Sequence, residues 1–226
     1  MTTAGETTVV RISQPKIDPL DKKILCKAMC TCDKNPTIGS DGRRLKQNCV
    51  ATTLKNYDAT MRSVGGRSNY KQEVNYNMRT DPPSPIMDGA DPTKRHDWLP
   101  GYIEKYMKGF KKGTGQIRRP DVVIVHDPNK PPTQDNIKQI VEMKFPPDEL
   151  SAEQRLAYED IAGSPTKLAK LEPSMCDCAK PDPDPPKIPV ELIEKLAQAG
   201  KTILFLLGRG RIPRDPFGSP LPSPAY

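Results

Sequence analysis

Hydrophobic residues are scarce in this chain, and none of them form a long run. They make up 35% of its 226 residues, below the usual share in globular proteins, and the longest apolar stretch spans only 203–207. A transmembrane helix needs about 20 such residues, and residues 1–16 lack the apolar segment of a secretory signal peptide. We therefore expect that the protein is made in the cytoplasm and does not insert into a membrane. Export would then require a dedicated secretion machine.

Histidine is also scarce, whereas basic residues are in excess. The chain has only His96 and His126, too few for the cluster that a histidine-metal nuclease would need. Lys and Arg number 35 against 28 Asp and Glu, a formal net charge of +7. Such a surplus favours an anionic partner, nucleic acid first and an anionic membrane surface second.

The six cysteines leave three alternatives open. An even number suits disulfides in a secreted protein, but a chain without a signal peptide is expected to keep its thiols reduced. Cys30 and Cys32, with Cys176 and Cys178, would together supply four thiolates to a structural Zn²⁺. The single residue between the cysteines of each pair is tighter than the usual zinc spacing. Zinc ligands, disulfides and free thiols are all compatible with the sequence.

Proline and glycine divide the chain, which contains 26 prolines. The Gly65–Gly66 pair closes a Cys-bearing helical and irregular region over 1–66. A second region over 67–212 is interrupted by a Pro-rich insertion at 173–189 and followed by a Pro-rich tail at 213–226. Hydrophobic spacing predicts helices over 21–29, 45–64, 67–76, 101–110, 152–162 and 190–198, and strands over 121–125, 137–145 and 202–207. This order favours an α/β or α+β fold around a small mixed sheet.

Three polar residues at the predicted strands carry the candidate chemistry. Because side chains alternate across a strand, Glu142 and Lys144 share one face, opposite the apolar face of Val141 and Met143. Asp121 opens the preceding strand and reaches the same end of the sheet if the two strands form a hairpin. Two carboxylates hold Mg²⁺ or Mn²⁺, and a neighbouring lysine stabilises developing negative charge. The alternative is an exposed, purely structural Glu–Lys pair.

A family resemblance lies in residues 118–163, RRPDVVIVHDP…NIKQIVEMKFPPDELSAEQRLAYEDIAG. This run resembles the VRR-NUC branch of the PD-(D/E)XK nucleases. Within that branch it looks closest to antibacterial DNase toxins delivered by type VI secretion. The segment YKQEVNYNM at 70–78 and the PSPIM turn at 83–87 are similar as well, so the resemblance covers about residues 68–172. It implies a restriction-endonuclease-like core, a small mixed sheet flanked by helices.

The resemblance also implies a role for each matching position. Asp121 and Glu142 would bind the metal, with the Met143 backbone carbonyl as a further ligand and Lys144 as the catalytic lysine. Gln154 would orient the site from the following helix, and Tyr158, one turn later, would line the same face. Glu73 would match the acidic residue that the family's first helix offers to the metal. Four basic residues are expected along the DNA groove: Lys111, Lys112, Arg118 and Arg119.

We therefore expect a metal-dependent DNA endonuclease. The resemblance implies a toxin that secretion machinery delivers into the cytoplasm of a target bacterium and that a cognate immunity protein neutralises. One alternative is a VRR-NUC nuclease of repair or phage origin with the same chemistry. The other is a zinc-stabilised nucleic-acid- or protein-binding module without catalysis, in which Glu142 and Lys144 are structural.

Overall fold

The computed structural model describes residues 15–111 and 113–178. The chain divides into two compact units, Met1–Pro181 and Asp182–Tyr226, and every described residue belongs to the first. The expected helix at 190–198, the strand at 202–207, the tail, the insertion from residue 179 on and Lys112 lie outside the described residues. Among the helices that are described, none is long and apolar enough to cross a membrane.

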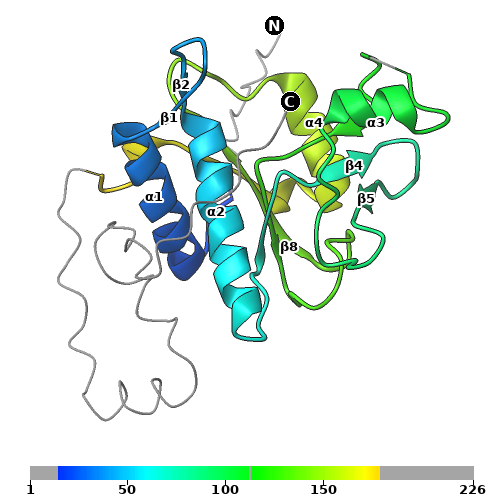
Figure 1. Ribbon diagram of the computed structural model, residues 1–226, viewed down its shortest axis with the longest axis horizontal. Helices are drawn as coiled ribbons and strands as arrows, with labels where there is room; N and C mark the ends of the chain where they lie inside the picture. The colour runs from blue at the N-terminus through cyan, green and yellow to red at the C-terminus, as the bar shows by residue number, and fades with distance from the viewer. Residues whose placement is uncertain (1–14, 112, 179–226) are drawn as a thin grey trace, which may run out of the picture. The chain divides into compact units, whose positions relative to one another are not determined.

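The central element of the described unit is a mixed four-stranded sheet (Figure 1). Its strands are β3 (Tyr70–Gln72), β7 (Val122–Val125), β8 (Ile137–Met143) and β9 (Leu168–Leu171), in the order β3-β7-β8-β9. The β3–β7 and β7–β8 pairs are antiparallel, and β8–β9 is parallel. The expected small mixed sheet and the β7–β8 hairpin are thus confirmed.

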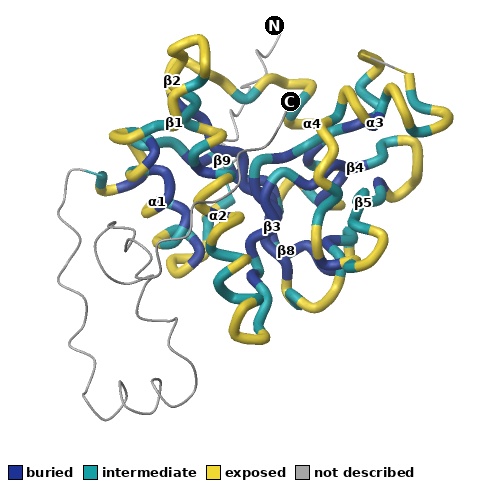
Figure 2. The backbone as a smooth tube through the Cα atoms, viewed as in Figure 1, coloured by how far each residue is buried: buried dark blue, intermediate teal, exposed yellow. Residues whose placement is uncertain are grey.

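Both faces of this sheet are covered, which explains why β7 has no polar residue. Helices α1 (Pro19–Lys34) and α2 (Lys46–Ser63) share one hydrophobic cluster with Val122 and Ile124. Helix α4 (Ala152–Ala162) shares a second cluster with Val123 and Val125. Figure 2 shows the strands as the buried layer between these helices. A strand buried on both faces reads as a continuous apolar run. The helices of residues 1–66 therefore share a core with the sheet.

A second, three-stranded sheet follows the order β5-β4-β6 and is antiparallel. It consists of β4 (Asn75–Asn77), β5 (Ser84–Ile86) and β6 (Ile117–Arg118), next to the short helix α3 (Pro100–Tyr106). The remaining elements are the β1–β2 hairpin (Thr37–Ile38 and Arg44–Leu45) and two 3₁₀ turns, η1 (Pro165–Lys167) and η2 (Pro173–Met175). Helix α3 ends at Tyr106, earlier than the predicted residue 110.

The helix expected over 67–76 is wrong, because this segment forms β3 and β4. Tyr70 is buried in the α1–α2 cluster, whereas Val74 and Tyr76 are buried in the α4 cluster. Between the two strands Glu73 adopts a positive φ of 48°. This unusual backbone conformation turns the chain from one sheet to the other. Tyr70 and Val74 are four residues apart, a hydrophobic spacing that fits one helix as well as two consecutive strands, so the pattern did not distinguish them.

The cysteines form three disulfides, so of the three alternatives that the sequence left open the disulfides occur. The zinc site on Cys30, Cys32, Cys176 and Cys178 and the reduced thiols do not. The pairs are Cys26–Cys176, Cys30–Cys178 and Cys32–Cys49, with Cα–Cα distances of 5.4, 5.1 and 5.6 Å. The geometry of α1 explains why these cysteines have different partners, because residues two apart on a helix do not face each other. Cys30 and Cys32 on α1 therefore point to different partners and do not converge on one ion.

Candidate active site

The β7–β8 register brings Asp121 and Glu142 together. Val122 pairs with Val141, so Asp121, one residue before β7, lies opposite Glu142. The Asp121 backbone N–H donates to Oε2 of Glu142 at 3.2 Å, and the Met143 N–H donates to Oδ2 of Asp121 at 2.8 Å. The two carboxylates are thus fixed by backbone groups at one end of the sheet.

Glu142 and Lys144 form a buried ion pair. Nζ of Lys144 lies 2.9 Å from Oε1 of Glu142, and the two residues are only 2% and 5% exposed. The exposed pair that the sequence left as an alternative does not occur. Buried charges are rare unless paired, and buried titratable groups with a specific charge partner cluster at functional sites.

Burial raises the pKa values of both carboxyl groups, and for Asp121 the nearby Glu142 carboxylate adds to the effect. Burial, followed by the nearby Glu142 carboxylate, raises the pKa of Asp121 to about 8, although the Met143 N–H and Lys144 act in the opposite direction. Burial also raises the pKa of Glu142, against the hydrogen bond and charge of Lys144. A divalent cation at this position would therefore replace the proton that Asp121 otherwise retains.

Helix α4 places two polar side chains at the same site. Ser151 and Gln154 form a capping box at its N-terminus. Oε1 of Gln154 also accepts from Nζ of Lys144 at 3.4 Å, as the resemblance implied for an orienting glutamine. One turn later, the buried Tyr158 donates from its hydroxyl to the Arg119 carbonyl at 3.3 Å. Burial, followed by the charges of Glu142 and Asp121, raises the pKa of Tyr158, so its hydroxyl stays protonated.

Glu73 reaches the site from a turn, not from a helix, which corrects the position implied by the resemblance. Its backbone N–H donates to the Asp121 carbonyl at 2.9 Å. Its Oε1 lies 3.3 Å from Nη2 of Arg119. The positive φ at Glu73 is the local feature that directs this carboxylate toward Asp121.

A small cavity of about 10 Å³ opens beside Asp121, about the space that one water molecule needs. It is lined by Gln47, Val50 and Ala51 of α2, with Glu73, Asp121 and Met143. Nε2 of Gln47 donates to the Met143 carbonyl at 3.2 Å. No feature of the sequence indicates Gln47, because it lies on an amphipathic helix far along the chain from the strand that it contacts.

The donor set fits a hard divalent cation. Asp121, Glu142 and the Met143 carbonyl offer oxygen atoms, which Mg²⁺ and Mn²⁺ prefer. Positive charge would relieve the repulsion from Glu142 that, after burial, raises the pKa of Asp121. Within the described ranges, however, no three His, Cys, Asp or Glu side chains gather closely enough to hold a metal by themselves. A bound ion would therefore depend on water and backbone oxygen for its remaining ligands.

The expected DNA-binding residues differ in their surroundings. Arg118 is engaged by Glu153 of α4, and Lys111 lies on an exposed loop. Arg119 faces the site through Glu73, and its Nη1 is buried without a hydrogen-bond partner. A buried donor without a partner is uncommon in folded proteins, and here it lies next to the carboxylate site.

Comparison with known proteins agrees with this geometry. Residues 68–172 match the VRR-NUC domain family, and these residues contain the strands β3, β7, β8 and β9, helix α4 and every polar group described above except Gln47. No curated protein and no solved structure matched the chain. Residues 68–172 are accordingly a nuclease-family domain with a PD-(D/E)XK-like fold, which implies a nuclease-type function.

Proposed function

We propose that this chain is a divalent-metal-dependent DNA endonuclease with its active site at Asp121, Glu142 and Lys144. The observation that carries the proposal is the β7–β8 register, which sets Asp121 opposite Glu142, beside the buried Glu142–Lys144 pair and within the matched domain. Metal-dependent phosphodiester hydrolysis requires hard oxygen ligands beside a cationic group, and this is the set present here.

Each residue has a defined task in this proposal. Asp121, Glu142 and the Met143 carbonyl hold Mg²⁺ or Mn²⁺, which when bound neutralises the phosphate and lowers the pKa of a water molecule. Lys144 stabilises the negative charge that develops on the phosphate. Gln154 keeps the Lys144 ammonium in place through its 3.4 Å hydrogen bond. Arg119, with its free Nη1, binds a phosphate oxygen of the substrate.

The test is cleavage of supercoiled plasmid DNA. We expect nicking with Mg²⁺ or Mn²⁺, none with EDTA, and none with an Asp121→Asn variant in either metal. An RNA of the same length tests the choice of DNA. Absence of nicking by a folded protein in both metals would leave the non-catalytic binding module as the better explanation of residues 68–172.

We further propose that the nuclease is an antibacterial toxin delivered by type VI secretion and neutralised by a cognate immunity protein. Two observations support this use: the resemblance of residues 118–163 to such toxins, and the three disulfides. Disulfides form and persist in oxidising compartments, such as the periplasm that a delivered toxin crosses. A nuclease of repair or phage origin remains the second candidate, and it has the same chemistry.

The toxin role is tested by expression in a bacterial strain whose cytoplasm allows disulfides to form, because the three bridges are part of the fold. Growth should stop with the wild type, continue with Lys144→Ala, and recover when the product of a neighbouring gene is co-expressed. An immunity protein that covers the DNA groove should lose affinity for Arg118→Glu/Arg119→Glu together with DNA. If only DNA binding is lost, the inhibitor binds elsewhere. Normal growth with a plasmid-nicking wild type would favour the repair or phage alternative.

A further inference from the structure

A second pocket lies beside the active site and has no role in the proposed chemistry. Its volume is about 120 Å³, which has room for several water molecules and hence for a phosphate group. It is formed by α2, β3 and the loop that precedes α3, with Lys55, Arg62, Lys71, Lys94, Arg95 and Asp97 among its lining residues. We name it the Lys71 pocket.

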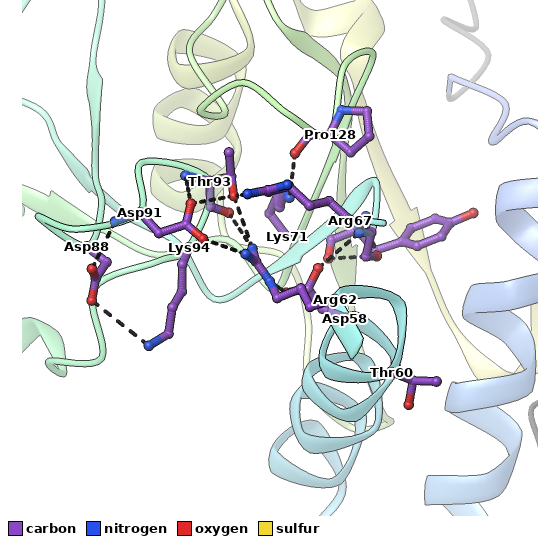
Figure 3. Close-up of polar contacts among 12 residues, drawn as sticks. Asp58, Thr60, Arg62, Arg67, Lys71, Asp88, Asp91, Thr93, Lys94 and Pro128 are labelled. Carbon is purple, nitrogen blue, oxygen red and sulfur yellow. Dashed lines mark hydrogen bonds and ion pairs between the residues drawn. The ribbon is translucent and has the colours of Figure 1, made fainter. Parts of the chain in front are cut away.

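Lys71 is the central residue of this pocket, and its charge is unmatched. The residue is 4% exposed, and its Nζ makes one hydrogen bond, to the Pro128 carbonyl at 3.2 Å. Within the described part of the chain, no carboxylate lies within the 4.0 Å ion-pair distance of this ammonium. Burying a charge without a partner is costly, so a packing role would be filled better by an apolar side chain. Figure 3 shows Lys71 turned toward Pro128 beside Arg62 and Arg67.

The basic residues around Lys71 are only partly neutralised. Arg62 is satisfied, because it pairs with Asp58 and Asp91 at 2.6 Å each. Asp97, by contrast, is shared by Lys55, Lys94 and Arg95 at 3.9–4.0 Å, the outer limit of an ion pair. Nε of Arg95 is buried without a hydrogen-bond partner. The pocket thus offers Lys71 and Arg95 to an anion that the chain itself does not supply.

The Lys71 pocket continues the active site along the same two elements. Val50 of α2 lines the active-site cavity and Asp58 lines the Lys71 pocket, a separation of about 12 Å along a helix that rises about 1.5 Å per residue. On the other side, Glu73 borders the first cavity and Gln72 the second. A strand of B-DNA advances about 3.4 Å per nucleotide along the duplex axis, so one strand can reach both pockets within a few nucleotides.

We propose that the Lys71 pocket binds a second phosphate of the substrate strand, within a few nucleotides of the bond that is cut. This inference rests on the proposed nuclease function. The ligand chemistry is a phosphate oxyanion held by Lys71 and Arg95. A strand held at two phosphates is fixed in register on the metal site, so the pocket would set the distance between the cleavage position and the bound phosphate.

The experiment measures binding of a labelled DNA oligonucleotide by anisotropy in EDTA, so that no strand is cut. Each phosphate is replaced in turn by an uncharged methylphosphonate. With the wild type, we expect affinity to fall severalfold at one or two adjacent positions, offset from the bond cut in Mg²⁺. Lys71→Gln should bind the unmodified strand about tenfold more weakly, with a salt-dependence slope smaller by about one. It should also be insensitive to replacement at those positions.

Two matched variants separate binding from folding. Lys71→Arg keeps the charge and should retain most of the affinity, and Lys23→Gln removes an exposed charge on α1 and should change neither affinity nor slope. Removing an unpaired buried charge should leave Tm unchanged or higher. A lower Tm together with weak binding that Lys71→Arg does not restore would assign Lys71 to the fold and overturn the proposal.

Three further outcomes are decisive. Wild-type affinity and slope in Lys71→Gln would overturn the site. A second outcome is that no methylphosphonate position changes the DNA affinity, while inorganic phosphate raises Tm only when Lys71 is present. This result would assign the pocket to free phosphate and overturn the proposal that it binds the substrate strand. Position-dependent binding without any Mg²⁺- or Mn²⁺-dependent nicking would support the pocket while the nuclease function itself fails.

Discussion

Glu142 near the end of β8 and Lys144 just after it are two residues apart and form a buried ion pair of 2.9 Å. Each is thus the partner that makes burial of the other tolerable. Removal of one leaves the other without its counter-charge, and breaking a buried pair typically costs about 3–5 kcal/mol. Both side chains do project away from the Val141 and Met143 face, as the strand alternation predicts. Substitution here nevertheless affects folding as well as chemistry.

Lys144→Ala should therefore lose both activity and stability. We expect plasmid cleavage to fall on the order of 10²-fold or more, because charge stabilisation is lost, and Tm to fall by several degrees. The double variant Glu142→Gln/Lys144→Met removes both charges, so it should recover part of the lost Tm while remaining inactive. Cleavage is measured by plasmid nicking and Tm by calorimetry. Wild-type activity in folded Lys144→Ala would defeat the site assignment.

The raised pKa of Asp121 predicts a pH-dependent response to metal. In the free protein the folded state holds a proton that the unfolded chain releases near the ordinary value of 3.8. This group therefore contributes stability below pH 3.8, and the contribution is lost as pH rises through about 8. Mg²⁺ takes the place of the proton. The rise in Tm on adding Mg²⁺ should thus be larger at pH 9 than at pH 6.

Asp121→Asn provides the control for this effect. The amide carries no titrating proton and binds a cation poorly, so both the Mg²⁺-induced rise in Tm and its pH dependence should be lost. Calorimetric titration in two buffers of different ionisation heat should also detect protons released by the wild type on metal binding. An equal Mg²⁺ effect at pH 6 and pH 9 would contradict the predicted exchange of proton for metal.

The disulfides predict a non-additive loss of stability. Cys26–Cys176 and Cys30–Cys178 span 150 and 148 residues, so either bridge alone closes almost the same loop. Replacing one pair by alanine should cost about 2 kcal/mol, because only the short ring between the bridges opens. Replacing both should cost about 5 kcal/mol or more, which exceeds the sum of the single losses.

Denaturant unfolding measures these losses, and the Cys32–Cys49 bridge supplies a reference. Its 17-residue separation predicts a loss of about 3 kcal/mol that adds independently to the others. A reducing agent should destabilise the wild type strongly and the six-alanine variant not at all. Purely additive losses for the two long bridges would show that they do not constrain the same segment.

The strands of the candidate active site were predictable from sequence because their signals are local. Val122 to Val125 form a continuous apolar run, Glu142 and Lys144 alternate with core residues, and Ser151 caps α4. The parts that were not predictable depend on contacts distant in sequence. Gln47 reaches Met143 across 96 residues, and the cysteine pairs are set by how α1 packs. Strands β3 and β4 were predicted as one helix because the four-residue separation of Tyr70 and Val74 is compatible with both structures.

The two neighbouring arginines should differ in their effect on catalysis. Arg118 is already engaged by Glu153 at an exposed position, whereas Arg119 contacts Glu73 and has a buried Nη1 without a partner. We expect Arg119→Gln to reduce kcat/KM more than tenfold, and Arg118→Gln to raise KM modestly, as loss of one surface phosphate contact would. Arg119→Lys should restore little, because lysine lacks the planar donor pair.

Glu73→Gln is the control for the ion pair itself: it leaves Arg119 in place and should retain substrate affinity in EDTA. Equal effects of the Arg118 and Arg119 variants on kcat and KM would show that neither arginine contacts the phosphate at the reacting position.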